Sequence, residues 1–261
     1  MTSPSRVLAI LGLFDETRPV WHTDEVNATL GYTRATGYRY VKDLVEAGFL
    51  QKVSPGWYSL GARIIELDYQ LRRSDPVLLA AVPVMERLVA RSRLDCVLSA
   101  MFGLHVVDTY RASGDADLKL GYGRGRPRPL FLGAAPKVLL AHRPRAQLAR
   151  IYESHGDDAA RAGLGDSWDA FRTFLANVRK DGFYLSKGEL EKAVGASGVP
   201  LLNADGDALA ALTLVGAIDV LVDAGPEKLK RMLTRAADEI RDAMEVDGAR
   251  RASSNRRGRA A

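Results

Sequence analysis

Basic and hydrogen-bonding side chains are concentrated between residues 32 and 44, in the stretch YTRATGYRYVKDL. If this stretch is helical, one side of it presents hydroxyl groups, a phenol and three cations. Arginine can bridge O6 and N7 of guanine, whereas threonine and lysine commonly contact phosphates. This is the chemistry of a helix that reads DNA, and the candidate contacts are Thr33, Arg34, Thr36, Tyr38, Arg39 and Lys42.

The opposite side of the same stretch is apolar and predicts how the helix is held. Gly37, Tyr40, Val41 and Leu44 recur at helical spacing, so we expect them to face a core. Glycine in mid-helix is about 0.5–1 kcal/mol less stable than alanine, so Gly37 is a cost that the sequence does not explain. Taken alone, the stretch is equally consistent with the solvated basic side of an ordinary amphipathic helix.

The neighbouring elements favour DNA recognition. Residues 22–31 predict a helix with Thr23 as N-cap, acids in its first turn and Gly31 as its stop. Residues 49–60 predict two short strands around a Ser-Pro-Gly turn. With an apolar helix before them, these elements have the order of a winged helix-turn-helix. In the hairpin, or wing, Lys52, Ser54 and Trp57 would approach the flanking DNA backbone.

The remainder of the chain predicts a second domain of the α+β class. Residues 62–76 predict a linker helix, and residues 77–247 alternate β-hairpin patterns with amphipathic helices. We expect an antiparallel sheet flanked by helices. The predicted division is therefore 1–61 for the winged helix-turn-helix, 62–76 for the linker, 77–247 for the second domain and 248–261 for a disordered, arginine-rich tail.

The overall charge gives the DNA interpretation no support. The formal net charge is +5, but five arginines lie in the tail at residues 248–261, which has no acid. Without them, 37 − 5 = 32 basic residues balance 32 acidic ones, so only local charge placement can argue for nucleic acid. The tail either adds non-specific phosphate contacts or is a solubilising chain end.

Features of secreted and membrane proteins are not evident. Cys96 is the one cysteine, which excludes an intrachain disulfide. No apolar run approaches the roughly 20 residues of a membrane span. The N-terminus lacks a signal-peptide cleavage pattern. We therefore expect a cytoplasmic protein with no membrane partner.

Patterns typical of catalysis or cofactor binding are weak. The loop GYGRGR (121–126) is followed by prolines instead of the helix start that would hold a phosphate. GASGV (195–199) departs from the nucleophile-elbow pattern at Val199, and no His–acid pair is evident to activate Ser197. Cys96 begins an apolar strand. We expect no enzyme activity, cofactor or metal, since no metal-ligand spacing surrounds the four histidines His22, His105, His142 and His155.

Motifs along nearly the whole chain resemble the IclR family of bacterial transcriptional regulators. They include SRVLAILGLF, LVEAGFLQK and GWYSLGARIIELD near the N-terminus, PLFLGAAPKVLLA around Lys137, and residues 178–216. The resemblance runs from about residue 5 to 247. It implies a winged helix-turn-helix, a linker helix and an effector-binding domain related to GAF and PAS folds. It also implies a homodimer or dimer of dimers that binds double-stranded operator DNA, represses or activates a catabolic or related operon, and senses a small organic effector.

The same resemblance implies where the effector binds. The commoner Asp, Cys and Ser of the family pocket are absent here, and Pro136 replaces the usual glycine and removes an amide donor. Ala196 and Val215 would leave an apolar cavity, which favours an aromatic acid or a bulkier ester-like compound over a glyoxylate-like acid. The implied positions are Leu118, Leu120, Ala134, Ala135, Ser186, Ala196, Thr213 and Val215.

Two other classes of protein share parts of this pattern. One is an enzyme with an accessory helix-turn-helix domain, and the other is an interaction module whose winged helix contacts protein. Binding to the protein's own promoter DNA in a mobility-shift assay separates the second alternative from a transcription factor.

Overall fold

The computed structural model describes residues 2–114 and 123–257 and divides into two compact units, Met1–Asp75 and Pro76–Ala261. Each unit is described by itself below. The domain boundaries expected from the sequence remain predictions.

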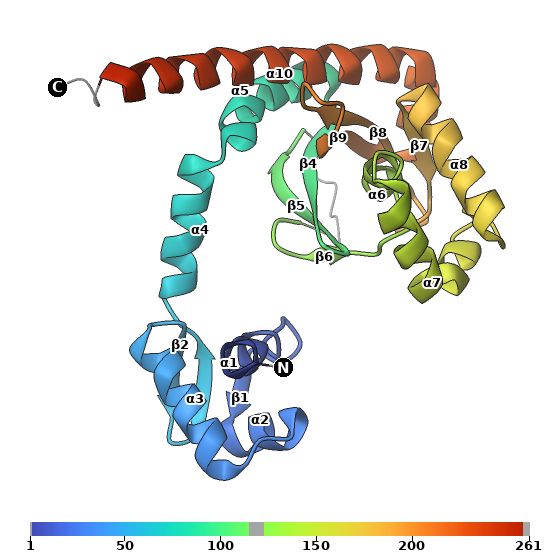
Figure 1. Cartoon of the computed structure of the whole chain (residues 1–261). Helices are drawn as coiled ribbons and strands as arrows, with labels where there is room; N and C mark the ends of the chain where they lie inside the picture. The colour runs from blue at the N-terminus through green and yellow to red at the C-terminus, as the bar shows by residue number, and fades with distance from the viewer. Residues whose placement is uncertain (1, 115–122, 258–261) are drawn as a thin grey trace. The chain divides into compact units, whose positions relative to one another are not determined.

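The first unit is a winged helix-turn-helix followed by a helix (Figure 1). Its strands form an antiparallel sheet in the order β1-β3-β2, which adds a strand, β1, to the predicted hairpin. The sequence missed β1 because three residues are too few to establish an alternating pattern. The elements are α1 (Ser3–Leu11), β1 (Val20–His22), α2 (Thr23–Leu30), α3 (Arg34–Glu46), β2 (Leu50–Ser54), β3 (Trp57–Leu60) and α4 (Arg63–Ser74).

The start and end of α2 are fixed by specific caps. His22, and not the predicted Thr23, is the N-cap: its Nδ1 accepts a hydrogen bond from the amide of Asp24. Glu25 accepts from the backbone amide of His22, which completes a capping box. The predicted stop is confirmed, because Gly31 has a φ of 65°, in the left-handed region that favours glycine.

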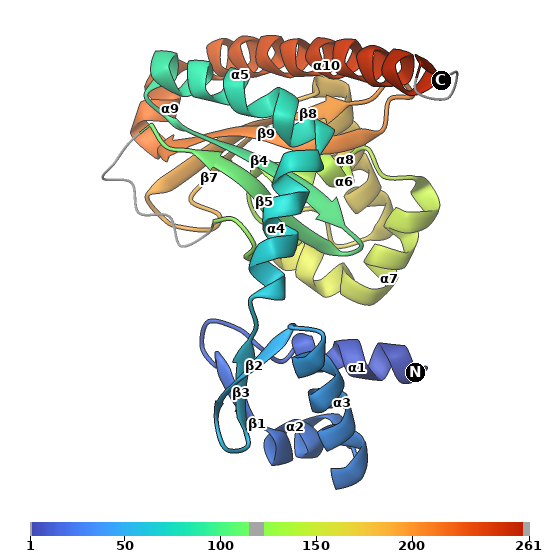
Figure 2. The same cartoon turned by 90° about the vertical axis from the view of Figure 1, so that its left-hand side faces the viewer.

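The second unit is a six-stranded antiparallel sheet in the order β6-β5-β4-β9-β8-β7, with helices on both faces. Figure 2 shows α5 and α10 side by side on one face, while α6, α7 and α8 cover the other. The elements are α5 (Pro76–Ser92), β4 (Asp95–Phe102), β5 (His105–Ala112), β6 (Pro127–Arg128), α6 (Ala134–Leu140), α7 (Arg145–Arg161), α8 (Trp168–Asp181), β7 (Tyr184–Lys187), β8 (Val194–Leu202), β9 (Ala208–Ala217), α9 (Ile218–Ala224) and α10 (Pro226–Arg257).

Separate hydrophobic cores fill the two sides of this sheet. Leu98, Leu212 and Leu214 face α5 and α10. On the other face, Phe171 of α8 packs with α6 and α7, and its ring centroid lies 6.1 Å from that of Phe131. The alternation along each strand therefore supplies both cores, as expected for a sheet buried on two faces.

The structure departs from the sequence predictions at the C-terminus and in one loop. α10 extends to Arg257, whereas the sequence predicts a disordered tail over residues 248–261. The short α9 was not predicted. Among the described residues, no helix has the length and apolarity that crossing a membrane requires.

Candidate functional site

The N-terminus of α3 is held by two of the predicted DNA contacts. Thr33 is the N-cap, and its Oγ1 accepts from the amide of Thr36 at 3.3 Å. The same hydroxyl donates to Oγ1 of Thr36 at 2.9 Å. Both threonines therefore fix the start of the helix, and their hydroxyls are engaged within it.

The remaining predicted contacts of α3 lie on its exposed side. Arg34, Tyr38, Arg39 and Lys42 are all exposed, whereas Tyr40, Val41 and Leu44 are buried as the periodicity predicts. The guanidinium of Arg34 lies 5.6 Å from the ring centroid of Tyr38. An exposed surface of cations and a phenol beside a fixed helix start is what base-edge and phosphate contacts require.

The wing is attached to the start of α2. The amide of Thr23 donates to the carbonyl oxygen of Gly56 at 3.0 Å. The ring of His22 meets that of Trp57 edge-on, with centroids 5.2 Å apart. The predicted wing contacts Ser54 and Trp57 are exposed, and they lie on a hairpin that is tied to the helix-turn-helix.

In the second unit, Ser186, Ala196 and Val215 are neighbours across β7, β8 and β9. They line a cavity of about 30 Å³ together with Arg128 and Glu191. The structure therefore brings these predicted effector residues together around a cavity that is too small for an organic acid.

The other predicted effector positions do not line this cavity. Thr213 donates through Oγ1 to the carbonyl of Val97, and Ala134 packs against the same part of β8 and β9. Ala135 is buried in the core beneath α6. Leu118 and Leu120 lie outside the described residues.

An ion pair between buried Lys137 and partly exposed Glu189 holds the loop beside the cavity. Glu189, in the loop between β7 and β8, accepts from Nζ of Lys137 at 2.5 Å and from the amide of Gly133 at 2.8 Å. Tyr184 donates to the other oxygen of Glu189 at 3.1 Å. Burial lowers the pKa of Lys137, opposed by Glu189, and burial raises the pKa of Tyr184. We call Lys137, Glu189 and Tyr184 the loop latch.

A second buried charge adjoins the same cavity. Nε of Arg128 lies 2.7 Å from Oδ1 of Asp108, and Ser99 donates to that oxygen at 2.7 Å. The side chains of Arg128 and Asp108 are 6% and 2% exposed. A guanidinium is therefore held in place at the cavity wall by a carboxylate behind it.

The sequence did not single out Arg128 or Glu189. Both lie in short loops or strand ends where periodicity carries no information, and a charged residue there normally implies a solvated surface. No cluster of three or more His, Cys, Asp or Glu in the described part of the chain is arranged to hold a metal.

Comparison with known proteins follows the two-unit division. The model of the IclR helix-turn-helix domain matches residues 3–54, and that of the bacterial transcriptional regulator IclR C-terminal region matches residues 71–242. Among curated relatives, the chain is 26% identical to the regulator KipR of Bacillus subtilis strain 168 over 210 residues, 80% of this chain and 83% of KipR. It is 26% identical to XynR of Escherichia coli K12 over 236 residues, 90% and 93% of the two chains.

Solved structures share the fold at low sequence identity. An IclR homologue from Microbacterium hydrocarbonoxydans, solved in complex with 4-hydroxybenzoate, aligns with a TM-score of 0.74 at 24% identity, over 94% of this chain and 100% of that one. An IclR family regulator from Brucella abortus aligns with a TM-score of 0.76 at 22% identity, over 93% and 92%. The two matched domains, in this order and across most of the sequence, show that the chain belongs to the IclR family of bacterial transcriptional regulators.

Proposed function

We propose that this regulator binds operator DNA through the exposed side of α3 and the wing, and that a small organic acid bound in the second unit alters that binding. The observation that carries the proposal is the exposed set Arg34, Tyr38, Arg39 and Lys42 on a helix whose start is fixed by Thr33. Arg34 and Arg39 supply base contacts, and Lys42 contacts a phosphate.

Fluorescence anisotropy with DNA from the protein's own promoter tests the DNA surface. Replacing either arginine by alanine is expected to weaken binding by roughly 10-fold or more, since one bidentate base contact contributes about 1–3 kcal/mol. Lys42→Ala is expected to reduce the salt dependence by about one ion, because it removes a phosphate contact. Arg150→Ala, an exposed arginine of α7, is the matched control. Equal affinity of Arg34→Ala, Arg39→Ala and wild type across a salt series would exclude α3 as the reading helix.

For the effector, we propose an aromatic acid or a bulkier ester-like compound in the cavity beside Ser186, Ala196 and Val215. A cavity of about 30 Å³ holds little more than a water molecule, so binding requires the latched loop to move outward. Arg128, which lines the cavity and is paired with Asp108, is the proposed partner for the acid group. The 4-hydroxybenzoate bound to the Microbacterium homologue supports an aromatic acid.

Thermal shift and calorimetry with 4-hydroxybenzoate, glyoxylate and pyruvate test the effector class. We expect a response to the aromatic acid that Ala196→Trp abolishes, because the indole fills the cavity. Glu189→Gln weakens the loop latch and is expected to lower the cost of opening, so the affinity should rise. A response to the small acids alone would contradict the proposal.

We further propose that the protein forms a homodimer through α4. No residue of α4 is buried, and its apolar residues Ile65, Tyr69 and Leu71 are exposed. A two-fold dimer would match the palindromic half-sites that helix-turn-helix regulators read. Light scattering with Ile65→Glu and Tyr69→Glu should report a smaller oligomer than wild type, whereas Arg150→Glu should not change it. Unchanged mass in both α4 variants would exclude this interface.

The proposal also includes a purely regulatory role, without a catalytic step. It places the protein in the cytoplasm, where bacterial DNA lies. Its support is the match of both units to regulators and the exposed α3 surface.

A further inference from the structure

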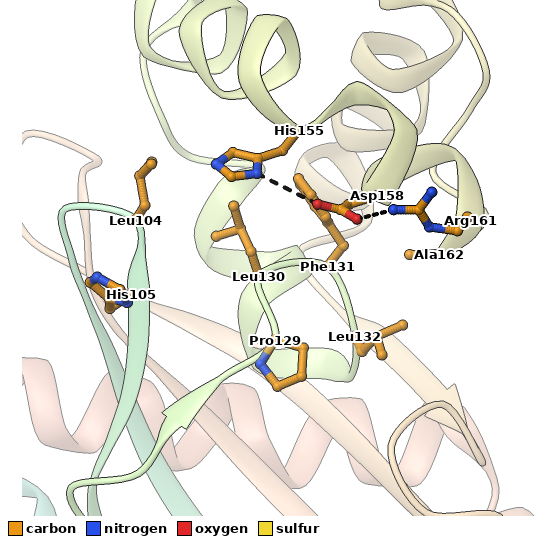
Figure 3. Close-up of a pocket in the computed structure, with 10 residues that line it drawn as sticks. All are labelled: Leu104, His105, Pro129, Leu130, Phe131, Leu132, His155, Asp158, Arg161 and Ala162. Carbon is orange, nitrogen blue, oxygen red and sulfur yellow. Dashed lines mark hydrogen bonds and ion pairs between the residues drawn. The ribbon is translucent and has the colours of Figure 1, made fainter. Parts of the chain in front are cut away.

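We infer that the second unit carries another small-molecule site, separate from the proposed effector cavity, for an apolar compound with one anionic group. It is a cavity of about 570 Å³ between the end of the β4–β5 hairpin, residues 129–132 and α7 (Figure 3). Small-molecule sites commonly measure roughly 300–1,000 Å³. The effector cavity, at about 30 Å³, shares no lining residue with it.

One side of the larger cavity is apolar. The segment between β6 and α6 runs along it, and the hairpin and the end of α7 complete it (Figure 3). Phe131 is buried and anchors the segment against Phe171 of α8, so this wall is fixed by the core behind it. The apolar lining residues are Leu104, Pro129, Leu130, Phe131, Leu132 and Ala162.

The polar side of the cavity offers more donors than acceptors. Asp158 pairs with Arg161, and its other oxygen lies 3.5 Å from Nδ1 of His155. The hydrogen bond from Arg161 lowers the pKa of Asp158, so this acid stays ionised and engaged. His105 faces the cavity from β5, and the donors of Arg161 and the two imidazoles are suited to a carboxylate or sulfonate.

A kink in α7 forms the rim of this site. His155 has φ −138° and ψ 22°, outside the helical region, in the middle of α7. Gly156 follows it, and a Cβ there would lie 3.3 Å from the ring of Tyr152. The break therefore turns the helix at the point where His155 reaches the cavity. An apolar wall with hydrogen-bond donors beside it is the lining that small-molecule sites commonly have.

The probe for this site is 8-anilinonaphthalene-1-sulfonate, an apolar anion that is too large for the effector cavity. Two of the four histidines, His105 and His155, line the larger cavity, while His22 and His142 do not. We expect the probe to gain fluorescence and to shift the imidazole carbon-bound proton resonances of His105 and His155 alone. Shifts confined to His22 or His142, or absent from all four, would overturn the assignment.

Substitutions separate this site from the effector cavity. Leu130→Glu places an anion in the wall and should weaken probe binding by more than about tenfold. Arg161→Gln, the second variant should the first not fold, should weaken it roughly fivefold, and Arg150→Gln on the same helix should not change it. Ala196→Trp should leave probe binding intact while abolishing the response to 4-hydroxybenzoate, so the two sites can fail independently. Probe affinity unchanged in both cavity variants would exclude the site.

Discussion

The amide side chain of Asn27 lies directly over the α carbon of Gly37, at the point where α2 meets α3. A Cβ built on Gly37 would lie 1.5 Å from Oδ1 of Asn27, well inside any real contact. Both residues are buried, and Oδ1 of Asn27 has no hydrogen-bond partner within the described residues. The glycine that the helix pattern left unexplained is therefore required by the close approach of the two helices.

This contact predicts that the effect of Gly37→Ala changes sign with residue 27. In wild type, the substitution should destabilise the first unit by about 1–3 kcal/mol through overpacking. In an Asn27→Ala background the obstruction is gone, so the same change should stabilise α3 by about 0.5–1 kcal/mol. Urea unfolding, followed by the fluorescence of buried Trp21 with Trp57 and Trp168 replaced by Phe, measures both. Additive effects in the double variant would show that the two residues do not interact.

The cap at Thr33 predicts that stability and DNA binding can be separated at one position. Thr33→Ala should destabilise the first unit by about 1 kcal/mol, because the amide of Thr36 loses its acceptor. Thr33→Asp keeps an N-cap acceptor but places a negative charge beside the proposed DNA surface. It should therefore retain stability and lose affinity for promoter DNA, while Thr33→Ser keeps both. Wild-type DNA affinity in Thr33→Asp would argue that the helix start lies away from the DNA.

The loop latch predicts that removing one charge lowers the free energy of unfolding much more than replacing both charges. Lys137 is 2% exposed, so Glu189→Leu would leave a buried ammonium without its carboxylate. Breaking a buried pair typically costs about 3–5 kcal/mol, whereas replacing both partners by apolar residues is often nearly neutral. Lys137→Met with Glu189→Leu should thus be more stable than Glu189→Leu alone. Urea unfolding followed by the fluorescence of Trp168, the tryptophan of this unit, measures these stabilities. A double variant that is less stable than either single variant would refute the ion-pair account.

His142 predicts a loss of stability in mild acid. Burial lowers its pKa, with Arg179 adding to the effect and the carbonyl of Val138 opposing it. The folded state therefore favours the neutral ring, and the unfolded chain binds more protons below the ordinary histidine pKa of about 6.5. The stability that neutral His142 supplies is full above that pH and is lost as the pH falls through the lowered pKa.

The measurement is the free energy of unfolding of wild type and His142→Gln between pH 7.5 and 5, at roughly half-unit steps. The difference between the two proteins should shift in favour of the variant as the pH falls. His105→Gln, at an exposed position, is the matched control. A difference that stays constant with pH would refute the assignment.

Much of the fold was accessible from the sequence because its signals are local. Gly31 and the Ser54–Gly56 turn mark backbone changes that few other residues permit, and the apolar side of α3 matches its buried side. The helical end of α10 was missed, since an arginine- and serine-rich composition resembles that of a disordered tail.

The site was only partly accessible, for a physical reason. Ser186, Ala196 and Val215 are brought together by the register of three strands, as the family pattern implies. Arg128 and Glu189 were not identified, because pairing across the fold decides whether a charge in a loop is buried. The large cavity beside α7 depends on the helix kink at His155, which hydrophobic periodicity in the sequence does not predict.

The attachment of the wing to α2 has a consequence for the thermodynamics of DNA binding. A Cβ at Gly56 would lie 2.2 Å from Nε2 of His22, and the carbonyl oxygen of Gly56 accepts a hydrogen bond from the amide of Thr23. The wing is thus already ordered relative to the helices of its unit before any DNA arrives. Little conformational entropy remains to be lost there on association, so preorganisation favours affinity. The distance between the proposed major-groove contacts of α3 and the proposed flanking contacts of the wing is already set in the free protein.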